Sequence, residues 1–217
     1  MGLFDNLFTK KAEEPAQEAT SQPTNSQPVG MLNLKKNDIL DLTKTSAHYD
    51  SLRLSAGWDI NKKGGSNYDL DLFALLLDSK DKLTSVTNPC VYYGNKKATG
   101  IELDKDNLTG EGDGDDENIF INLTKIPPAV NKIILAVSIY DADSRRQSFQ
   151  YVNNAYVRLV DTSNKKEVEI CRYNLSNEGG NSTAVICAEL FRNGSDWSFK
   201  AVGDFTKGSI SQIKNKY

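Results

Sequence analysis

The sequence predicts an all-β protein, an antiparallel β-sandwich of about ten strands with a short C-terminal helix and a disordered N-terminal extension. From residue 31 onward, short runs rich in β-branched and aromatic residues are separated by clusters of Gly, Asn, Asp and Pro. Several runs alternate apolar and polar residues, as a strand with one wet face does. The sequence between these runs lacks the length and period of helices, which favours a sandwich over a wound α/β sheet.

The first thirty residues differ from the rest of the chain. Residues 12–30 combine three of the six prolines with Gln, Ser, Thr, Ala and Glu. Such a stretch buries too little apolar surface to offset its ordering entropy, so a disordered linker is expected. Residues 1–11 place Leu3, Phe4, Leu7 and Phe8 on one face of a short helix. They are interpreted as an amphipathic docking peptide for a membrane surface or a partner groove, with a frayed terminus as the alternative.

Residues 31–217 are expected to form one domain. A closing helix is predicted in GSISQIKNKY at the C-terminus, with Ser209 as its N-cap and Ile210 and Ile213 as its apolar contacts. The first two strands could also form one bent strand. The expected strands are 31–34, 38–43, 50–57, 69–77, 90–93, 118–123, 132–140, 155–161, 166–173, 182–191 and 196–203.

Composition excludes several classes of protein. Lys and Arg number 26 against 29 Asp and Glu, for a formal charge of −3, so bulk binding of nucleic acid is not expected. No apolar run approaches the ~18 residues of a membrane span, and no signal peptide is recognisable, so a cytoplasmic protein is expected. Three widely spaced cysteines and a single histidine, His48, suggest neither a disulfide framework nor a zinc site.

The most informative segment lies between Glu102 and Glu117, where eight acidic residues face a single basic one, Lys105. Like charges repel by about 1 kcal/mol per pair at 4 Å even in water, so a folded loop of this kind requires a cation or must stay extended. Interleaved glycines, Gly110, Gly112 and Gly114, permit tight turns that aim carbonyl oxygens inward. Oxygen ligands without His or Cys are typical of Ca²⁺. A merely solvated acidic turn is the alternative.

A second acidic group lies upstream. Asp69 and Asp71 stand at i and i+2 at the start of an apolar strand, so both carboxylates are expected on one face of the sheet. Asp59, which ends the preceding strand, could reach the same sheet edge. Ordinary turn residues and edge-blunting aspartates are the alternative interpretation of all three.

Several segments together resemble the TerD family of bacterial tellurium-resistance and stress proteins. The likeness covers residues 31–217, and the glycine-rich acidic loop followed by a strand, Ile126, Pro127 and a second strand is its most specific part. The matching segments are GWD at 57–59, YDLDLFALLL at 68–77, DNLTGEGDGDDE at 106–117, LTKIPPAVNKIILAVSIYDAD at 123–143, and the later NAYVRLVD and AELFRNGSDWSFKAVG.

This resemblance implies a β-sandwich that binds two calcium ions through the acidic loop and the Asp-rich strand end. It implies no enzymatic activity, and it implies action with other tellurium-resistance proteins and membrane-associated partners. Thr109 and Gly112 would contribute carbonyl oxygens. The side chains that match the family's metal ligands are Asp59, Asp69, Asp71, Asn107, Asp113, Asp115, Asp116 and Glu117. Family members usually begin near the first strand, so the N-terminal extension is a departure.

Catalysis is disfavoured because the sequence contains no GxSxG, P-loop, HExxH or strand-linked GxGxxG motif. The sequence therefore favours a calcium-stabilised scaffold for protein partners. It would be cytoplasmic, with peripheral contact at the inner membrane through residues 1–11. The alternative is a calcium-dependent phospholipid- or carbohydrate-binding module, in which Trp58 and Tyr68 beside the aspartates could stack on a ligand. Packing in the core or at the sheet edge is the more usual role of such aromatic residues and is the preferred interpretation of both.

Overall fold

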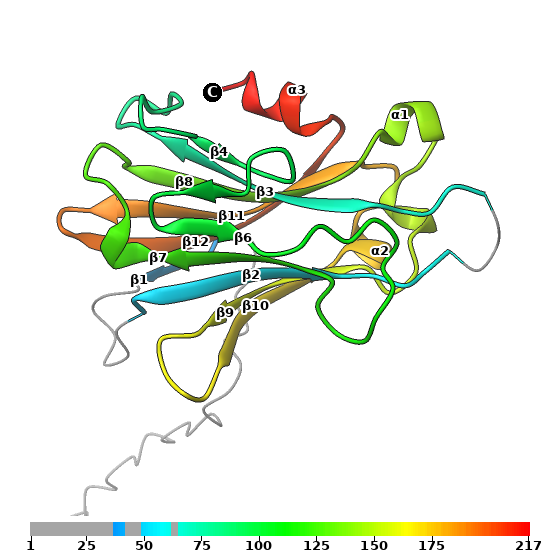
Figure 1. The fold of residues 1–217 in the computed structure, drawn as a ribbon, viewed down its shortest axis with the longest axis horizontal. Coiled ribbons are helices and arrows are strands. Elements are labelled where there is room, and N and C mark those ends of the chain that lie inside the picture. Colours follow the sequence, from blue (N-terminus) through cyan, green and yellow to red (C-terminus); the bar gives the residue numbers. More distant parts are fainter. Residues whose placement is uncertain (1–36, 42–48, 62–64) are drawn as a thin grey trace, which may run out of the picture.

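Two six-stranded sheets pack face to face in the computed structural model, which describes residues 37–41, 49–61 and 65–217 (Figure 1). Every pairing between named strands is antiparallel. The first sheet has the order β1 (Ile39–Asp41), β12 (Asp196–Thr206), β11 (Ala184–Asn193), β8 (Lys132–Ile139), β3 (Leu70–Leu77) and β4 (Cys90–Val91). The second has the order β10 (Val168–Asn174), β9 (Tyr156–Asp161), β2 (Ser51–Gly57), β7 (Glu117–Asn122), β6 (Ile101–Leu103) and β5 (Lys97–Ala98).

The predicted antiparallel sandwich is confirmed, and most expected strands match to within a few residues. Two short strands, β5 and β6, were not predicted. The expected strand at 31–34, the N-terminal peptide and linker, and His48 lie outside the described residues. Short helical turns also interrupt the connections, at η1 (Leu123–Lys125), α1 (Ala142–Arg145), η2 (Phe149–Tyr151) and α2 (Leu175–Glu178).

Strand β3 is buried on both faces, which explains its unbroken apolar run. Leu72 and its even-numbered neighbours pack into the core between the two sheets. Phe73, Leu75 and Leu77 form a second apolar cluster on the other face of the sheet, together with Ile210 and Ile213 of α3 (Ile210–Lys214). The predicted closing helix therefore covers this outer face.

Helix α3 begins as the sequence predicts. The Ser209 side chain accepts a hydrogen bond from the Gln212 amide, and the Gln212 side chain accepts one from the Ser209 amide, which completes a capping box. Within the part of the chain that the structure describes, no helix is both long enough and apolar enough to cross a bilayer.

The candidate site lies at one edge of β3, at the start of the strand. Strand β4 pairs with β3 only at Ala74 and Leu75. Among the described residues, the start of β3 therefore pairs with β8 on one side and with no strand on the other. The loop between β6 and β7 of the second sheet approaches this open side. The two sheets therefore meet at the start of β3, where the acidic loop and the Asp69–Asp71 segment lie beside each other.

Candidate metal centre

Three carboxylates from separate parts of the chain meet at the open edge of β3. Asp71 comes from β3, Asp106 from the β6–β7 loop, and Glu117 is the first residue of β7. One oxygen from each lies within 4.8 Å of the others. Asp71 and Glu117 are buried whereas Asp106 is exposed, so this carboxylate cluster is open to solvent on one side.

Glu117 is held in place by two backbone amides. Its Oε2 accepts a hydrogen bond from the Leu72 amide at 2.9 Å, and its Oε1 accepts one from the Asn107 amide at 3.1 Å. The Leu72 amide belongs to the open edge of β3, so a side chain from the second sheet occupies the place of a neighbouring strand. This bond fixes the distance between the start of β3 and the start of β7.

Burial and crowding disfavour ionisation of these carboxyl groups. Burial raises the pKa of Glu117 to about 9, against the opposing effect of the Leu72 amide. Burial, followed by the charges of Asp69 and Asp106, raises the pKa of Asp71 to about 8. Burial and Asp106 raise the pKa of Asp69 to about 6. A bound cation would reverse these shifts, because it stabilises the ionised forms.

Asp69 provides an additional buried oxygen. This residue is 5% exposed, and its Oδ1 has no hydrogen-bond partner among the described residues. Buried polar atoms normally have a partner, so an orphaned carboxylate oxygen beside three other carboxylates calls for a cation. The donor set consists of oxygen atoms only, which fits Ca²⁺, an ion that takes about six to eight oxygen ligands, better than the softer transition metals.

The acidic loop is shaped by internal contacts. Asn107 Oδ1 accepts hydrogen bonds from the amides of Thr109 and Gly110, and Asn107 Nδ2 donates to Asp116 Oδ1 at 2.8 Å. Gly110 has a φ of +72°, and a Cβ added there would lie 2.5 Å from the Trp58 ring. The turn therefore requires glycine at this position, where the loop rests directly on a buried tryptophan.

The predicted site residues divide into two groups. Asp69, Asp71 and Glu117 gather at or beside the cluster. The remaining ones have other contacts or lie along the exposed loop. Asp116 accepts from the Trp58 amide, Asp59 accepts from Asn154, Asn107 bonds within the loop, Asp115 pairs with Arg158, Thr109 is partly buried, and Gly112 and Asp113 are exposed.

Asp106 was not among the predicted site residues, although it is one of the eight acidic residues of the loop. Charge density alone does not tell which of eight carboxylates faces Asp71. For Trp58 the structure shows the packing role rather than stacking on a ligand. Trp58 is buried and donates its Nε1 hydrogen to the Tyr68 carbonyl at 2.9 Å, so its ring supports the loop rather than facing a ligand.

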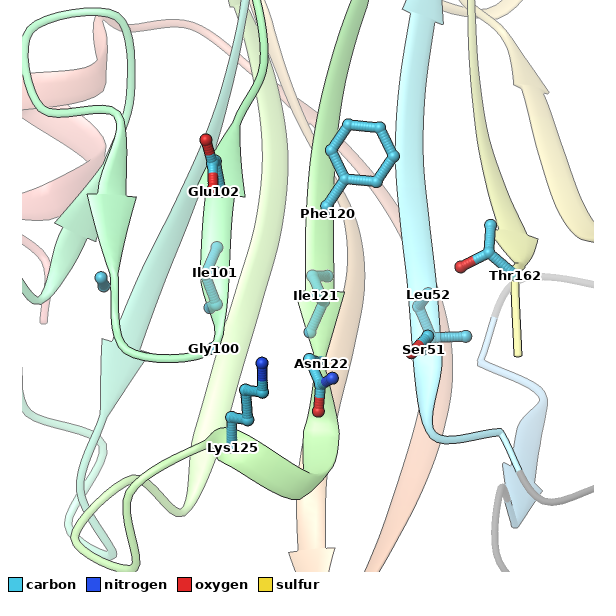
Figure 2. A pocket seen from close by; sticks show the side chains of 11 residues that line it. Ser51, Leu52, Gly100, Ile101, Glu102, Phe120, Ile121, Asn122, Lys125 and Thr162 are labelled. Atoms are coloured by element: carbon cyan, nitrogen blue, oxygen red, sulfur yellow. The ribbon is translucent and has the colours of Figure 1, made fainter. Parts of the chain in front are cut away.

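A pocket of about 410 Å³ lies elsewhere, along β6, β7 and β2 (Figure 2). Figure 2 shows Glu102, Phe120 and Lys125 around it, with Phe120 41% exposed. Its lining includes none of the cluster residues. Because it brings together no group of carboxylates or nucleophiles, the carboxylate cluster is the better candidate for function.

The fold and the site together define a class of protein. Its members are two-sheet antiparallel sandwiches that carry a cluster of carboxylate oxygens at a sheet edge. The family model described as the TerD domain matches residues 31–217. This chain belongs to the TerD domain family, as the sequence motifs predict.

Characterised relatives place the family among tellurium-resistance and stress-response proteins. The chain is 36% identical over 188 residues to "Tellurium resistance protein TerD" of Serratia marcescens, covering 86% of this chain and 96% of that protein. It is 36% identical over 189 residues to "General stress protein 16U" of Bacillus subtilis (strain 168), with the same coverage. These names describe resistance and stress response and name no enzymatic activity.

A solved structure supports the fold. The crystal structure of a homologue of telluride resistance protein (TerD) from Streptomyces coelicolor A3(2) superposes with a TM-score of 0.66 at 20% identity. The superposition covers 76% of this chain and 95% of that one.

Proposed function

We propose that this TerD family protein binds calcium at the cluster of Asp71, Asp106 and Glu117 and acts as a non-enzymatic, calcium-stabilised scaffold for protein partners in the stress response. The orphaned, buried Oδ1 of Asp69 beside three converging carboxylates is the observation that carries the proposal. When bound, Ca²⁺ would supply the positive charge that offsets the repulsion and burial of these groups. The chain's own part is to hold the oxygens in place through the Leu72 and Asn107 amides.

A calcium titration tests this proposal. We expect an exothermic or endothermic isotherm that saturates, and a melting temperature that rises with calcium. At a free calcium concentration of about one hundred times Kd, linkage stabilises the fold by about 2.7 kcal/mol, which corresponds to a rise of about 5–10 °C for a chain of this size. Two bound ions remain a prediction, and the stoichiometry of the isotherm counts them. A flat isotherm together with equal melting temperatures in chelator and in calcium would reject the proposal.

The scaffold would work with other tellurium-resistance proteins and with membrane-associated partners, near the inner membrane. Two features support this part: the relatives' resistance and stress names, and the apolar face with terminal lysines that the sequence places in residues 1–11. The peptide would supply attachment, and the sandwich would present the surface for partners.

Vesicle flotation separates this tethered scaffold from a calcium-dependent lipid-binding module. With vesicles that contain anionic phospholipid, we expect the full chain to float with or without calcium, because Lys10, Lys11 and the apolar face of the peptide provide the contact. The chain lacking residues 1–11 should remain at the bottom of the gradient. Flotation that requires calcium and survives the deletion would instead support the lipid-binding module.

A further inference from the structure

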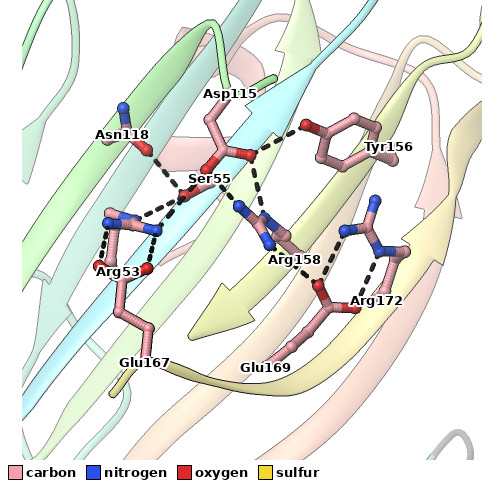
Figure 3. A network of polar contacts seen from close by, with 9 residues as sticks. All are labelled: Arg53, Ser55, Asp115, Asn118, Tyr156, Arg158, Glu167, Glu169 and Arg172. Atoms are coloured by element: carbon pink, nitrogen blue, oxygen red, sulfur yellow. Dashed lines mark hydrogen bonds and ion pairs between the residues drawn. The ribbon is translucent and has the colours of Figure 1, made fainter. Parts of the chain in front are cut away.

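Asp115, at the end of the acidic loop, is held by two side chains of β9 (Figure 3). Arg158 donates to both carboxylate oxygens, with Nε to Oδ1 at 2.9 Å and Nη2 to Oδ2 at 2.7 Å. The Tyr156 hydroxyl donates to Oδ1 at 2.9 Å. The Asp115 side chain is 11% exposed, so a two-pronged guanidinium contact holds it in a largely buried position.

These contacts lie on the outer face of the second sheet. In β9, Val157 and Leu159 point into the core between the sheets, so Tyr156 and Arg158 point outward. Asp115 meets them on this outer face. Glu117, by contrast, lies on the same side of β7 as Ile119 and Ile121, whose side chains point into the core. Its side chain reaches the edge of β3.

The short segment from Asp115 to Glu117 is therefore anchored on both sides of the sheet. Between the two anchors, the Asp116 amide donates to the Ala56 carbonyl at 2.8 Å, and Asp116 Oδ2 accepts from the Trp58 amide at 2.8 Å. Only two peptide units separate the outer anchor from a member of the cluster. Loss of the outer anchor would free the last turn of the loop, and with it the alignment of Glu117 with Asp71.

Arg158 is itself held by a second carboxylate. Its Nη1 donates to Glu169 at 3.1 Å, and Glu169 also accepts two hydrogen bonds from Arg172, each at 2.8 Å (Figure 3). The contact with Glu169 therefore fixes the Arg158 guanidinium independently of Asp115. The positive charge of Arg158 also offsets the negative charge of Asp115, which weakens the repulsion among the eight acidic residues of the loop.

We propose that Arg158 and Tyr156 are positioning residues for the metal centre: by holding Asp115 on the outer face, they keep the β6–β7 loop in the conformation that places Asp106 and Glu117 beside Asp71. Asp115 is then an anchor of the loop rather than a metal ligand. The inference rests on the proposed calcium function and extends it to residues outside the cluster. Partners that orient metal ligands typically change metal affinity by about 10–100-fold when they are replaced.

A double-mutant cycle on calcium affinity tests the proposal. Calorimetric titration of the full chain with CaCl₂ would compare wild type, Asp115→Asn, Arg158→Ala and the double variant. We expect each single variant to raise Kd about tenfold without changing stoichiometry. The double variant should lose less affinity than the two single losses combined, because both changes break the Asp115–Arg158 contact, although Asp115 also contacts Tyr156 and Arg53. Lys97→Ala is the matched control, since it breaks an exposed ion pair with Glu102 on the same sheet and should change Kd by less than about twofold.

Each outcome decides between the alternatives. Wild-type calcium affinity in Arg158→Ala would reject the positioning role. The role would also be rejected if the losses of calcium affinity added in the double variant and Asp115→Asn bound fewer ions, because Asp115 would then be a ligand. If Arg158→Ala does not fold, Arg158→Lys keeps the charge but loses the two-pronged contact, and it should still raise Kd. A flat isotherm for wild type would reject the calcium function itself, whereas wild-type binding with unaffected Arg158 variants rejects only this inference.

Discussion

Asp71→Asn is expected to weaken calcium binding by more than about 100-fold, because it removes a charged ligand from the centre of the carboxylate cluster. The same change should raise the melting temperature measured in chelator. In the metal-free protein, burial and the charges of Asp69 and Asp106 disfavour the ionised form of Asp71 and raise its pKa to about 8. Folding at neutral pH must therefore bury a charge or take up a proton, and either event costs free energy that asparagine avoids.

The expected rise in chelator is about 2–4 °C, equivalent to about 1 kcal/mol for a chain of this size. Calorimetric titration and thermal unfolding in matched buffers measure the two effects. Glu111→Gln is the control, because Glu111 lies in the same loop and is exposed, so the same loss of charge occurs away from the cluster. Wild-type calcium affinity in Asp71→Asn would show that Asp71 is not a ligand.

Trp58→Ala is expected to destabilise the metal-free protein by about 3–5 kcal/mol. Trp58 is 3% exposed and lies in the core between the sheets. Its indole donates a hydrogen bond to the Tyr68 carbonyl, and Gly110 packs directly against the ring. A cavity at this position would remove support from the acidic loop as well as from the core. A loss of this size is a large fraction of the stability of an ordinary domain.

Equilibrium unfolding in urea, with chelator present, measures this loss as a lower midpoint at an unchanged slope. Trp58→Phe is the matched variant. It keeps most of the apolar volume and loses the indole hydrogen bond, so its loss should be the smaller of the two. A change below about 1 kcal/mol in Trp58→Ala would contradict the packing of this ring under the loop.

The sequence predicted those parts of the fold whose local pattern is strong. The β3 run was recognisable because eight consecutive residues are apolar apart from one aspartate. The closing helix was recognisable from Ser209 and the spacing of Ile210 and Ile213. Strands β5 and β6 were not, because they have two and three residues and neither lies in a longer apolar and aromatic run such as the CVYY that marks β4.

The candidate site was predictable in its chemistry but only partly in its geometry. The acidic loop and the Asp69–Asp71 pair stood out by charge and spacing. Which carboxylates face one another depends on how the β6–β7 loop crosses to the edge of β3, and this is a tertiary contact. The role of Asp115 depends on the pairing of β2 with β9, which brings Arg158 opposite Ser55. Forty-three positions separate Asp115 from Arg158, so no local pattern indicates their contact.

The hydrogen bond between Glu117 and the Leu72 amide also bears on self-association. An uncovered strand edge is a template on which a strand from another molecule can add, and such addition leads to polymers. At Leu72 the donor that an incoming strand would need is already taken by a carboxylate. Glu117, a member of the carboxylate cluster, therefore also blocks growth of the first sheet at this point.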